Sequence, residues 1–444
     1  MLAPPLPEFV PPKRSPAALS PRLPPSADPR IQAFDERWEE FEAADYEARL
    51  ALFLRTLDEP ELMDGEMAFE MLNTLHSETA ARQERYRFEE LAEALHRQLP
   101  DVYAEEAGYI IPWRITNALA TSQTDAVGAL ARELALIAGR AIDPFFQTVD
   151  QLAYHGQLQT LLEIISIAWP RLKASSNVVS WALDDLGSRA ADVMMFDYLE
   201  RGGSVTAIDP ELREQISPYL NLSPEGFEEW LRFLAGRSER LWSMTDFAFK
   251  PPSRARHRDE EGEDELDREA GEDEGRRNLI SLSAEYLGYL RREENVAYTR
   301  GEMGREQIVR YLFDRFDGEL APRLSMAETI LGGKKRKAHP PAPPPAHALC
   351  PDRTTLDIYL GQLCNIFNPQ YYKVAALFEL IPAWLRFLEA RGLIDGSRRE
   401  ATLSELSGVR DDLLKLGGIG ESDPALQQAV EHWNEGAGPS ARNH

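Results

Sequence analysis

The sequence has few of the features that mark secreted, metal-binding or membrane proteins. Its 444 residues include only two cysteines, Cys350 and Cys364, which excludes a disulfide framework and fits a reducing compartment. No apolar run approaches the ~18 residues that a membrane-spanning helix needs. The N-terminus lacks a positive flank followed by an apolar core, so it does not resemble a signal peptide. We therefore expect a cytoplasmic protein with no membrane partner.

Strand signals are also nearly absent. No sustained alternation of apolar and polar residues lies between turn residues, and only residues 204–208 fit a short extended piece. Apolar residues recur instead at steps of three and four, and the first such series is Ile31, Phe34, Trp38 and Phe41. This spacing lines one face of a helix. The sequence therefore predicts an all-α protein.

The predicted helices come in pairs joined by short turns. The pairs are 31–41 with 45–57, 62–79 with 86–99, 102–119 with 124–138, and 145–154 with 158–169, where Pro170 ends the last helix. Further helices are predicted at 177–198, 225–234, 279–290, 305–316, 354–367, 371–390, 404–416 and 424–433. Pairs of roughly 35–45 residues are typical of an α-solenoid, in which each pair buries one face by stacking on the next. We expect such helix-hairpin repeats to form an α-solenoid-like array, followed by a C-terminal helical unit.

One segment resembles the second half of a tetratricopeptide repeat. Gly156 lies at its turn, and apolar residues follow at the spacings of the packing residues in that repeat: Leu158, Leu161, Ile165 and Ala168. Pro170 falls earlier than the proline of the repeat, and the first helix lacks the usual Trp and Leu-Gly. The resemblance covers about a third of the chain and implies the architecture without naming a ligand.

Composition separates the parts expected to fold from those expected to be disordered. Residues 1–30 contain ten prolines, and residues 259–274 contain eleven acids against one base, which is −10 of the formal net charge of −25. The expected order is a Pro-rich disordered tail at 1–30, a helical-repeat domain at 31–250, an acidic disordered linker at 251–278, a helical segment at 279–331, a basic and Pro-rich linker at 332–351, a C-terminal helical unit at 352–436 and a disordered tail at 437–444.

The motifs of common catalytic and cofactor sites are missing. Gly333 and Lys334 do not form a phosphate-binding loop, because no glycine lies five residues before Gly333 and no Ser or Thr follows Lys334. The Gly418–Gly420 pair lacks a preceding strand and a third glycine, which argues against a dinucleotide fold. No nucleophile elbow and no His-Glu-x-x-His motif occurs. We expect no catalytic residue and no cofactor.

Two groups of residues suggest a metal site and fall short of one. Glu93 and His96 have the Glu-x-x-His spacing of a carboxylate-bridged di-iron site, but no second such motif accompanies them. His347, Cys350 and Cys364 offer three ligand types, whereas a structural zinc site needs four ligands, commonly in two close pairs. Cys364 follows an apolar residue by one helical turn and is expected to pack as a small apolar side chain. We expect no metal.

Two features suggest a charged or nucleic-acid partner. Lys334, Lys335, Arg336 and Lys337 form a basic cluster that can be a solvated linker, a phosphate-binding or localisation signal, or a docking segment for the acidic tract. The stretch 384–394 resembles the recognition-helix end of winged helix–turn–helix domains, but the residues after it are helical by pattern and do not predict a wing. The acidic balance argues against a general nucleic-acid surface.

These observations favour a non-catalytic scaffold or adaptor that binds another protein or a peptide through its helical repeats. Two alternatives stay open. One is an enzyme of unknown class with a site in the helical array, since fold does not decide function. The other is a nucleic-acid-binding regulator that uses the C-terminal helical unit and the basic cluster. The sequence does not predict the partner's identity or the oligomeric state.

Overall fold

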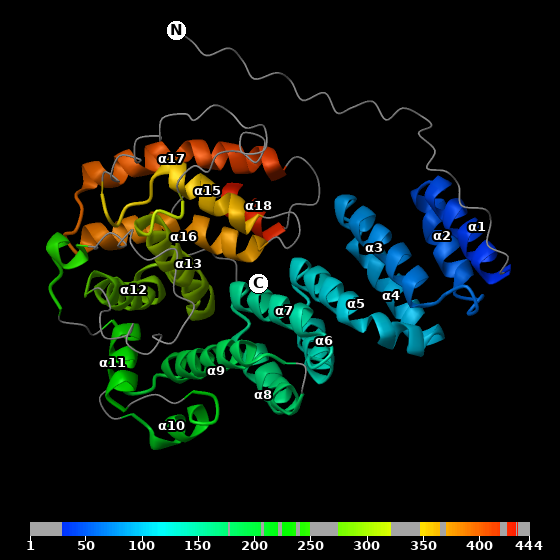
Figure 1. The fold of residues 1–444 in the computed structure, drawn as a ribbon, viewed down its shortest axis with the longest axis horizontal. Helices are drawn as coiled ribbons and strands as arrows, with labels where there is room; N and C mark the ends of the chain where they lie inside the picture. The colour runs from blue at the N-terminus through cyan, green and yellow to red at the C-terminus, as the bar shows by residue number, and fades with distance from the viewer. Residues whose placement is uncertain are drawn as a thin grey trace, which may run out of the picture. The chain divides into compact units, whose positions relative to one another are not determined.

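The computed structural model describes residues 29–175, 178–205, 208–220, 224–236, 240–248, 274–320, 347–364, 370–417, 424–431 and 433. These ranges hold α-helices, one 3-10 helix and no strand, so the predicted all-α class is confirmed (Figure 1). No described helix combines the length with the hydropathy that a bilayer-spanning segment requires. The predicted disordered tails and linkers fall mostly outside the described residues, as does the basic cluster Lys334–Lys337.

The chain divides into two compact units between Glu106 and Ala107, a boundary that lies inside α5. We call residues up to Glu106 unit 1 and the rest unit 2. The helices that begin in unit 1 are α1 (Pro29–Ala43), α2 (Tyr46–Thr56), α3 (Gly65–Ala81), α4 (Arg85–Gln98) and α5 (Pro100–Ala120). The boundary falls within the predicted 31–250 domain.

The helices of unit 1 lie close to their predicted ranges, although α3 begins at Gly65 and not at residue 62. Asp45 accepts a hydrogen bond from the backbone N–H of Ala48, and Asp64 accepts one from Met67, so both aspartates cap a helix. The apolar stripes of α2, α3 and α4 meet in a core that includes Phe53, Leu75 and Phe88, and none of these three side chains is exposed.

The remaining helices belong to unit 2. They are α6 (Thr124–Leu136), α7 (Ile142–Tyr154), α8 (Leu158–Ala174), α9 (Ser180–Glu200), α10 (Pro210–Ile216), α11 (Pro224–Leu234), the 3-10 helix η1 (Met244–Phe247), α12 (Glu274–Glu293), α13 (Tyr298–Phe316), α15 (Arg353–Leu363), α16 (Tyr371–Ala390), α17 (Gly396–Gly417) and α18 (Pro424–Glu431). The helices of the predicted segments 279–331 and 352–436 share one apolar core.

Helix α16 lies at the centre of that core and packs against α7, α12, α13, α15, α17 and α18 (Figure 1). Thirteen of its 20 residues are buried, on nearly every side of the helix. A helix that is apolar all round is stable only when other elements surround it. The later helices of unit 2 therefore form one cooperative core around α16.

The proline inside α16 removes one backbone hydrogen bond, and the side chain of Trp433 replaces it. Pro382 has no N–H, so the carbonyl of Phe378, four residues earlier, loses its helical donor. The indole Nε1–H of Trp433 donates to this carbonyl at 3.1 Å, and the Trp433 ring stacks on Phe378 with the ring centroids 5.0 Å apart. A side chain thus replaces the missing backbone hydrogen bond.

Helix α7 connects segments that are far apart in sequence. The hydroxyl of Thr299 donates to the carbonyl of Ala153 at 2.7 Å, and Gln151 Nε2 donates to the Tyr372 hydroxyl at 2.6 Å. In an ideal solenoid each repeat contacts only its neighbours. These long-range contacts are additional to any stacking of neighbouring pairs, and the solenoid-like array and its tetratricopeptide resemblance stay predictions.

Helix α8 does not end at Pro170, which corrects the predicted end of this helix. It continues to Ala174 because Leu172, two residues past the proline, is only 1% exposed. Burial of that side chain compensates for the hydrogen bond that proline removes. The predicted linker at 251–278 also ends earlier than expected, since α12 begins at Glu274.

The role of Trp433 can be tested with a double-mutant cycle. Replacing it, as Trp433→Phe, leaves the buried Phe378 carbonyl without a donor and is expected to lower the free energy of unfolding by about 1–3 kcal/mol. In a Pro382→Ala background the new backbone N–H satisfies that carbonyl, so the cost of Trp433→Phe should fall by at least half. Urea denaturation of the four proteins measures both costs, and equal costs in the two backgrounds contradict the assignment.

Candidate functional site

The residues that the sequence singled out as metal ligands do not assemble into a metal site. Glu93 and His96 are exposed on α4, and the His96 ring stacks on Tyr103 with centroids 4.2 Å apart. His347 and Cys350 lie near the start of α15, and Cys364, at its end, packs partly buried against the core. In the part of the chain that the structure describes, no three His, Cys, Asp or Glu side chains are arranged to hold a metal ion.

Burial keeps both His347 and Cys350 uncharged. It lowers the pKa of the His347 ring and raises the pKa of the Cys350 thiol. A protonated, buried thiol is neither a metal ligand nor a nucleophile. These two residues therefore serve the packing of the segment 347–352.

The stretch that resembles a recognition helix is buried. Trp384, Phe387 and Leu388 on α16 are at most 1% exposed, and the next element is α17, a helix. No strand that could form a wing occurs in the described ranges. These side chains hold the core of unit 2 and cannot reach a DNA groove without unfolding it.

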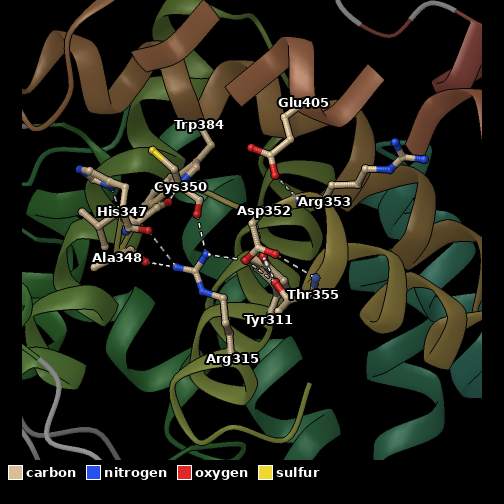
Figure 2. A network of polar contacts seen from close by, with 11 residues as sticks. Tyr311, Arg315, His347, Ala348, Cys350, Asp352, Arg353, Thr355, Trp384 and Glu405 are labelled. Atoms are coloured by element: carbon tan, nitrogen blue, oxygen red, sulfur yellow. Dashed lines mark hydrogen bonds and ion pairs between the residues drawn. The ribbon is translucent and has the colours of Figure 1, made fainter. Parts of the chain in front are cut away.

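One buried charged group that sequence reasoning missed is Arg315 on α13. Figure 2 shows its guanidinium pointing at the segment 347–352, which leads into α15. Nη1 donates to the carbonyl of Cys350 at 2.5 Å, and Nη2 donates to the carbonyl of Ala348. The carboxylate of Asp352 lies 3.6 Å from Nη1, and the side chain of Arg315 is 3% exposed.

Two further hydrogen bonds fix the segment 347–352 in place. Trp384 Nε1 donates to the carbonyl of Leu349 at 2.9 Å, and the backbone N–H of Asp352 donates to the Tyr311 hydroxyl at 3.2 Å (Figure 2). Backbone carbonyls and one carboxylate thus pair with the two Nη atoms of the buried guanidinium, whereas its buried Nε forms no hydrogen bond within the described ranges. The arrangement fixes a chain segment between α13 and α16.

Loss of Arg315 should destabilise the protein strongly. Replacing it, as Arg315→Leu, leaves the carbonyls of Ala348 and Cys350 without their donor and removes the ion pair with Asp352, so we expect a loss of about 3–5 kcal/mol in the free energy of unfolding. Chemical denaturation measures this loss. The matched control is Arg353→Leu, which removes a half-exposed pair with Asp412 at 3.2 Å and should cost about 0–1 kcal/mol. Equal losses in the two variants would show that the contacts of Arg315 with residues 348–352 stabilise the protein no more than an exposed ion pair does.

A second group of charges, which we call the α9–α13 charged cluster, lies between these two helices and their neighbours. It comprises Asp150 of α7, Asp185, Arg189 and Asp192 of α9, Glu302, Arg305 and Glu306 of α13, and Lys373 of α16. Five carboxyl groups face three cations in it.

The cations of this cluster are paired. Arg305 lies 2.6 Å and 2.5 Å from the two carboxylate oxygens of Glu302 and donates to the Ser283 hydroxyl at 3.0 Å. Arg189 binds Asp150 at 2.5 Å and Asp185 at 2.9 Å, and Lys373 binds Asp150 at 3.2 Å. The pairs of Asp150 with Arg189 and Lys373 join α7 to α9 and α16, and the Arg305–Ser283 hydrogen bond joins α13 to α12.

Asp192 is, with Glu306, one of two members of the cluster that form no hydrogen bond or ion pair with any described residue. Burial raises the pKa of its carboxyl group well above the usual range, and the neighbouring Glu302 carboxylate raises it further. Arg305 and Arg189 oppose this effect without cancelling it. A carboxyl group with a raised pKa among fixed charges is a candidate for proton chemistry, although structural ion networks produce the same effect.

Asp192 makes stability depend on pH in a defined direction. Since its pKa is higher in the folded protein than in the unfolded chain, stability falls as pH rises from about 4 through the folded value, and stays low above it. We expect Asp192→Asn to raise the melting temperature at pH 8, and the difference from wild type to shrink at pH 5. The control Asp184→Asn, at an exposed position of the same helix, should show no such trend. A stabilisation that is independent of pH would contradict this assignment.

Unit 1 differs from unit 2 in its charge. Residues 29–106 contain 21 acidic residues against eight arginines and no lysine, a formal charge of −13. With the −10 of residues 259–274, these two stretches carry −23 of the −25 of the whole chain. Sequence reasoning noticed the acidic tract and missed the acidic unit, because its charges are interleaved with the apolar residues of good helices.

Arginines inside unit 1 join its helices. The guanidinium carbons of Arg82 and Arg87 lie 4.2 Å and 5.6 Å from the ring centroid of Tyr46, and the Tyr46 hydroxyl donates to Glu84 at 2.8 Å. Burial and the Glu84 carboxylate raise the pKa of Tyr46 to about 12. Arg49 binds Glu78 at 2.5 Å and so links α2 to α3. Such pairs use arginines internally and leave a surplus of carboxylates at the surface.

Comparison with known proteins gives no relative: no family model, curated protein or solved structure matches this chain.

Proposed function

We propose that this protein is a non-catalytic adaptor, and that its acidic unit 1 holds another protein by electrostatic attraction. The observation that carries the proposal is the charge of −13 on residues 29–106. A folded surface with one dominant sign of charge raises the encounter rate with partners of the opposite sign and repels partners of the same sign. The partner expected from this chemistry is a basic protein segment.

The use of the other charged groups supports the same proposal. The Nη atoms of Arg315 donate to backbone carbonyls, Arg305 is paired with Glu302 of its own helix, and Arg189 is paired with Asp150 of α7. These groups stabilise the fold of unit 2, which supplies a large helical body joined to the acidic unit. The surface charge of unit 1 has no comparable structural use, since surface carboxylates in excess repel one another and destabilise the compact state.

One observation favours a second candidate, an enzyme. Asp192 is a carboxyl group whose pKa is raised by burial and by the Glu302 carboxylate, and a raised pKa lets a carboxylic acid donate a proton closer to neutral pH. This candidate requires a substrate that is turned over by the purified protein and lost on Asp192→Asn. The adaptor proposal requires neither turnover of a substrate nor a loss of activity on Asp192→Asn.

Affinity capture with a charge-neutralised variant tests the adaptor proposal. The variant replaces four exposed carboxylates of unit 1 by glutamine: Glu36, Glu39, Glu61 and Glu70. The control replaces four exposed carboxylates of unit 2 by their amides: Glu214, Glu229, Asp357 and Asp411. Captured proteins are quantified by mass spectrometry from an extract at about 0.1 M salt, where the screening length is about 10 Å.

The wild type and the control should retain the same partners, and the unit 1 variant should lose most of them. Since salt screens exposed charges, washing at about 0.5 M salt should release the partners from all three proteins. Equal recovery by all three proteins, or no partner together with turnover in a metabolite mixture, refutes the adaptor proposal. Circular dichroism of the variants confirms that the helices are intact.

A further inference from the structure

The outward side of α2 presents a continuous solvent-exposed surface. Glu47, Ala51, Leu54 and Asp58 follow one another at steps of four, three and four residues along α2 and the turn after it, and all four are exposed. The opposite side of the helix carries the buried core residues. Residues at these steps share one side of a helix. We call these four residues the α2 face.

An exposed aromatic side chain from α4 adjoins one end of the α2 face. Arg87 binds both carboxylate oxygens of Glu47 at 2.9 Å and 2.8 Å, and its Nε lies 3.4 Å from the hydroxyl of Tyr86. Tyr86 is 59% exposed and Leu54 is 44% exposed. Unit 1 thus exposes Leu54 on the α2 face and Tyr86 beside the Glu47 end of that face, and Ile31 of α1 is a third exposed large apolar side chain of the unit.

The cations beside the α2 face are already neutralised within unit 1. Arg55 binds Glu40 at 3.0 Å, and Arg87 binds Glu47 and, at 3.1 Å, Glu84. A group that approaches this surface therefore meets a net negative potential. This charge decides the sign of the partner, and Leu54 and Tyr86 decide that the partner must also supply apolar side chains.

We propose that the α2 face binds a basic amphipathic helix of a partner protein, an inference that rests on the adaptor function proposed above. From Glu47 to Asp58 the face is about 16 Å long at 1.5 Å per residue, which matches about three turns of a bound helix. Apolar residues on one side of that helix cover Leu54 and Tyr86. A lysine or arginine beside them lies opposite Asp58, since Arg87 already binds both carboxylate oxygens of Glu47.

A synthetic peptide tests this inference directly. The probe is a fluorescein-labelled peptide of about three heptads, built from Leu and Lys with helical periodicity. Its binding to the full chain is measured by fluorescence anisotropy. We expect saturable binding whose dissociation constant rises at least about tenfold between about 0.05 M and 0.5 M salt. A peptide in which Glu replaces Lys should not bind.

Matched substitutions locate the binding surface. Leu54→Ser and Tyr86→Ser should each weaken binding about tenfold, the size expected of an interface anchor. The controls are Leu241→Ser and Tyr109→Ser, which change side chains that are 94% and 53% exposed outside unit 1, and they should leave the dissociation constant within about twofold. All four side chains are exposed, and thermal melts confirm that each variant is folded.

The outcomes separate this inference from the adaptor proposal. If a scrambled Leu–Lys peptide binds as tightly, or if the unit 1 substitutions weaken binding no more than their controls, the α2 face is not the docking site. If the peptide does not bind but partners are still captured through unit 1 charges, the adaptor proposal stands and this inference fails. Preferred binding of the Leu–Glu peptide overturns the assigned sign of the partner.

Discussion

Burial of α16 on nearly every side is the constraint on which the rest of unit 2 depends. Its apolar side chains leave water only if α7, α12, α13, α15, α17 and α18 all pack around it. The same helix contains Pro382, so one of its buried carbonyls needs a donor from elsewhere. Trp433 supplies that donor from beyond the last described helix. A residue near the end of the chain thus completes the hydrogen bonding of the helix at the centre.

Charge acts in opposite ways in the two units. In unit 2 the enclosed cations Arg189, Arg305 and Arg315 are satisfied by carboxylates and backbone carbonyls, so they fix helices and a chain segment in place. In unit 1 the arginines pair locally, and the remaining carboxylates give the surface one sign. The first use of charge stabilises the fold, whereas the second lowers stability and acts at a distance on other molecules. This difference is why the proposed partner site lies on unit 1.

The helices were predictable to the extent that apolar periodicity decides them. The pattern around Leu50 and Phe53 predicts α2 correctly, whereas α3 begins at Gly65, behind its cap Asp64, and not at the predicted residue 62. Errors occur where tertiary burial outweighs a local signal, as at Pro170, past which α8 continues because Leu172 is buried. The helix predicted from Arg305 begins at Tyr298 instead, which places Glu302 one turn before Arg305. Because the predicted helix starts at Arg305, the sequence does not predict that Glu302 and Arg305 lie on the same helix.

The sequence by itself determined the all-α class and most helices, because apolar spacing along one chain segment is local information. The charge of unit 1 also follows from the sequence, because it needs only a count of acidic and basic residues. Only the tertiary structure decided that Arg315 binds carbonyls of residues 348 and 350, that Asp192 lies among charges from two helices, and that Leu54 and Tyr86 stay exposed. Each of these depends on which helices meet, and contacts such as that between Gln151 and Tyr372, 221 residues apart, leave no periodic signal in the sequence.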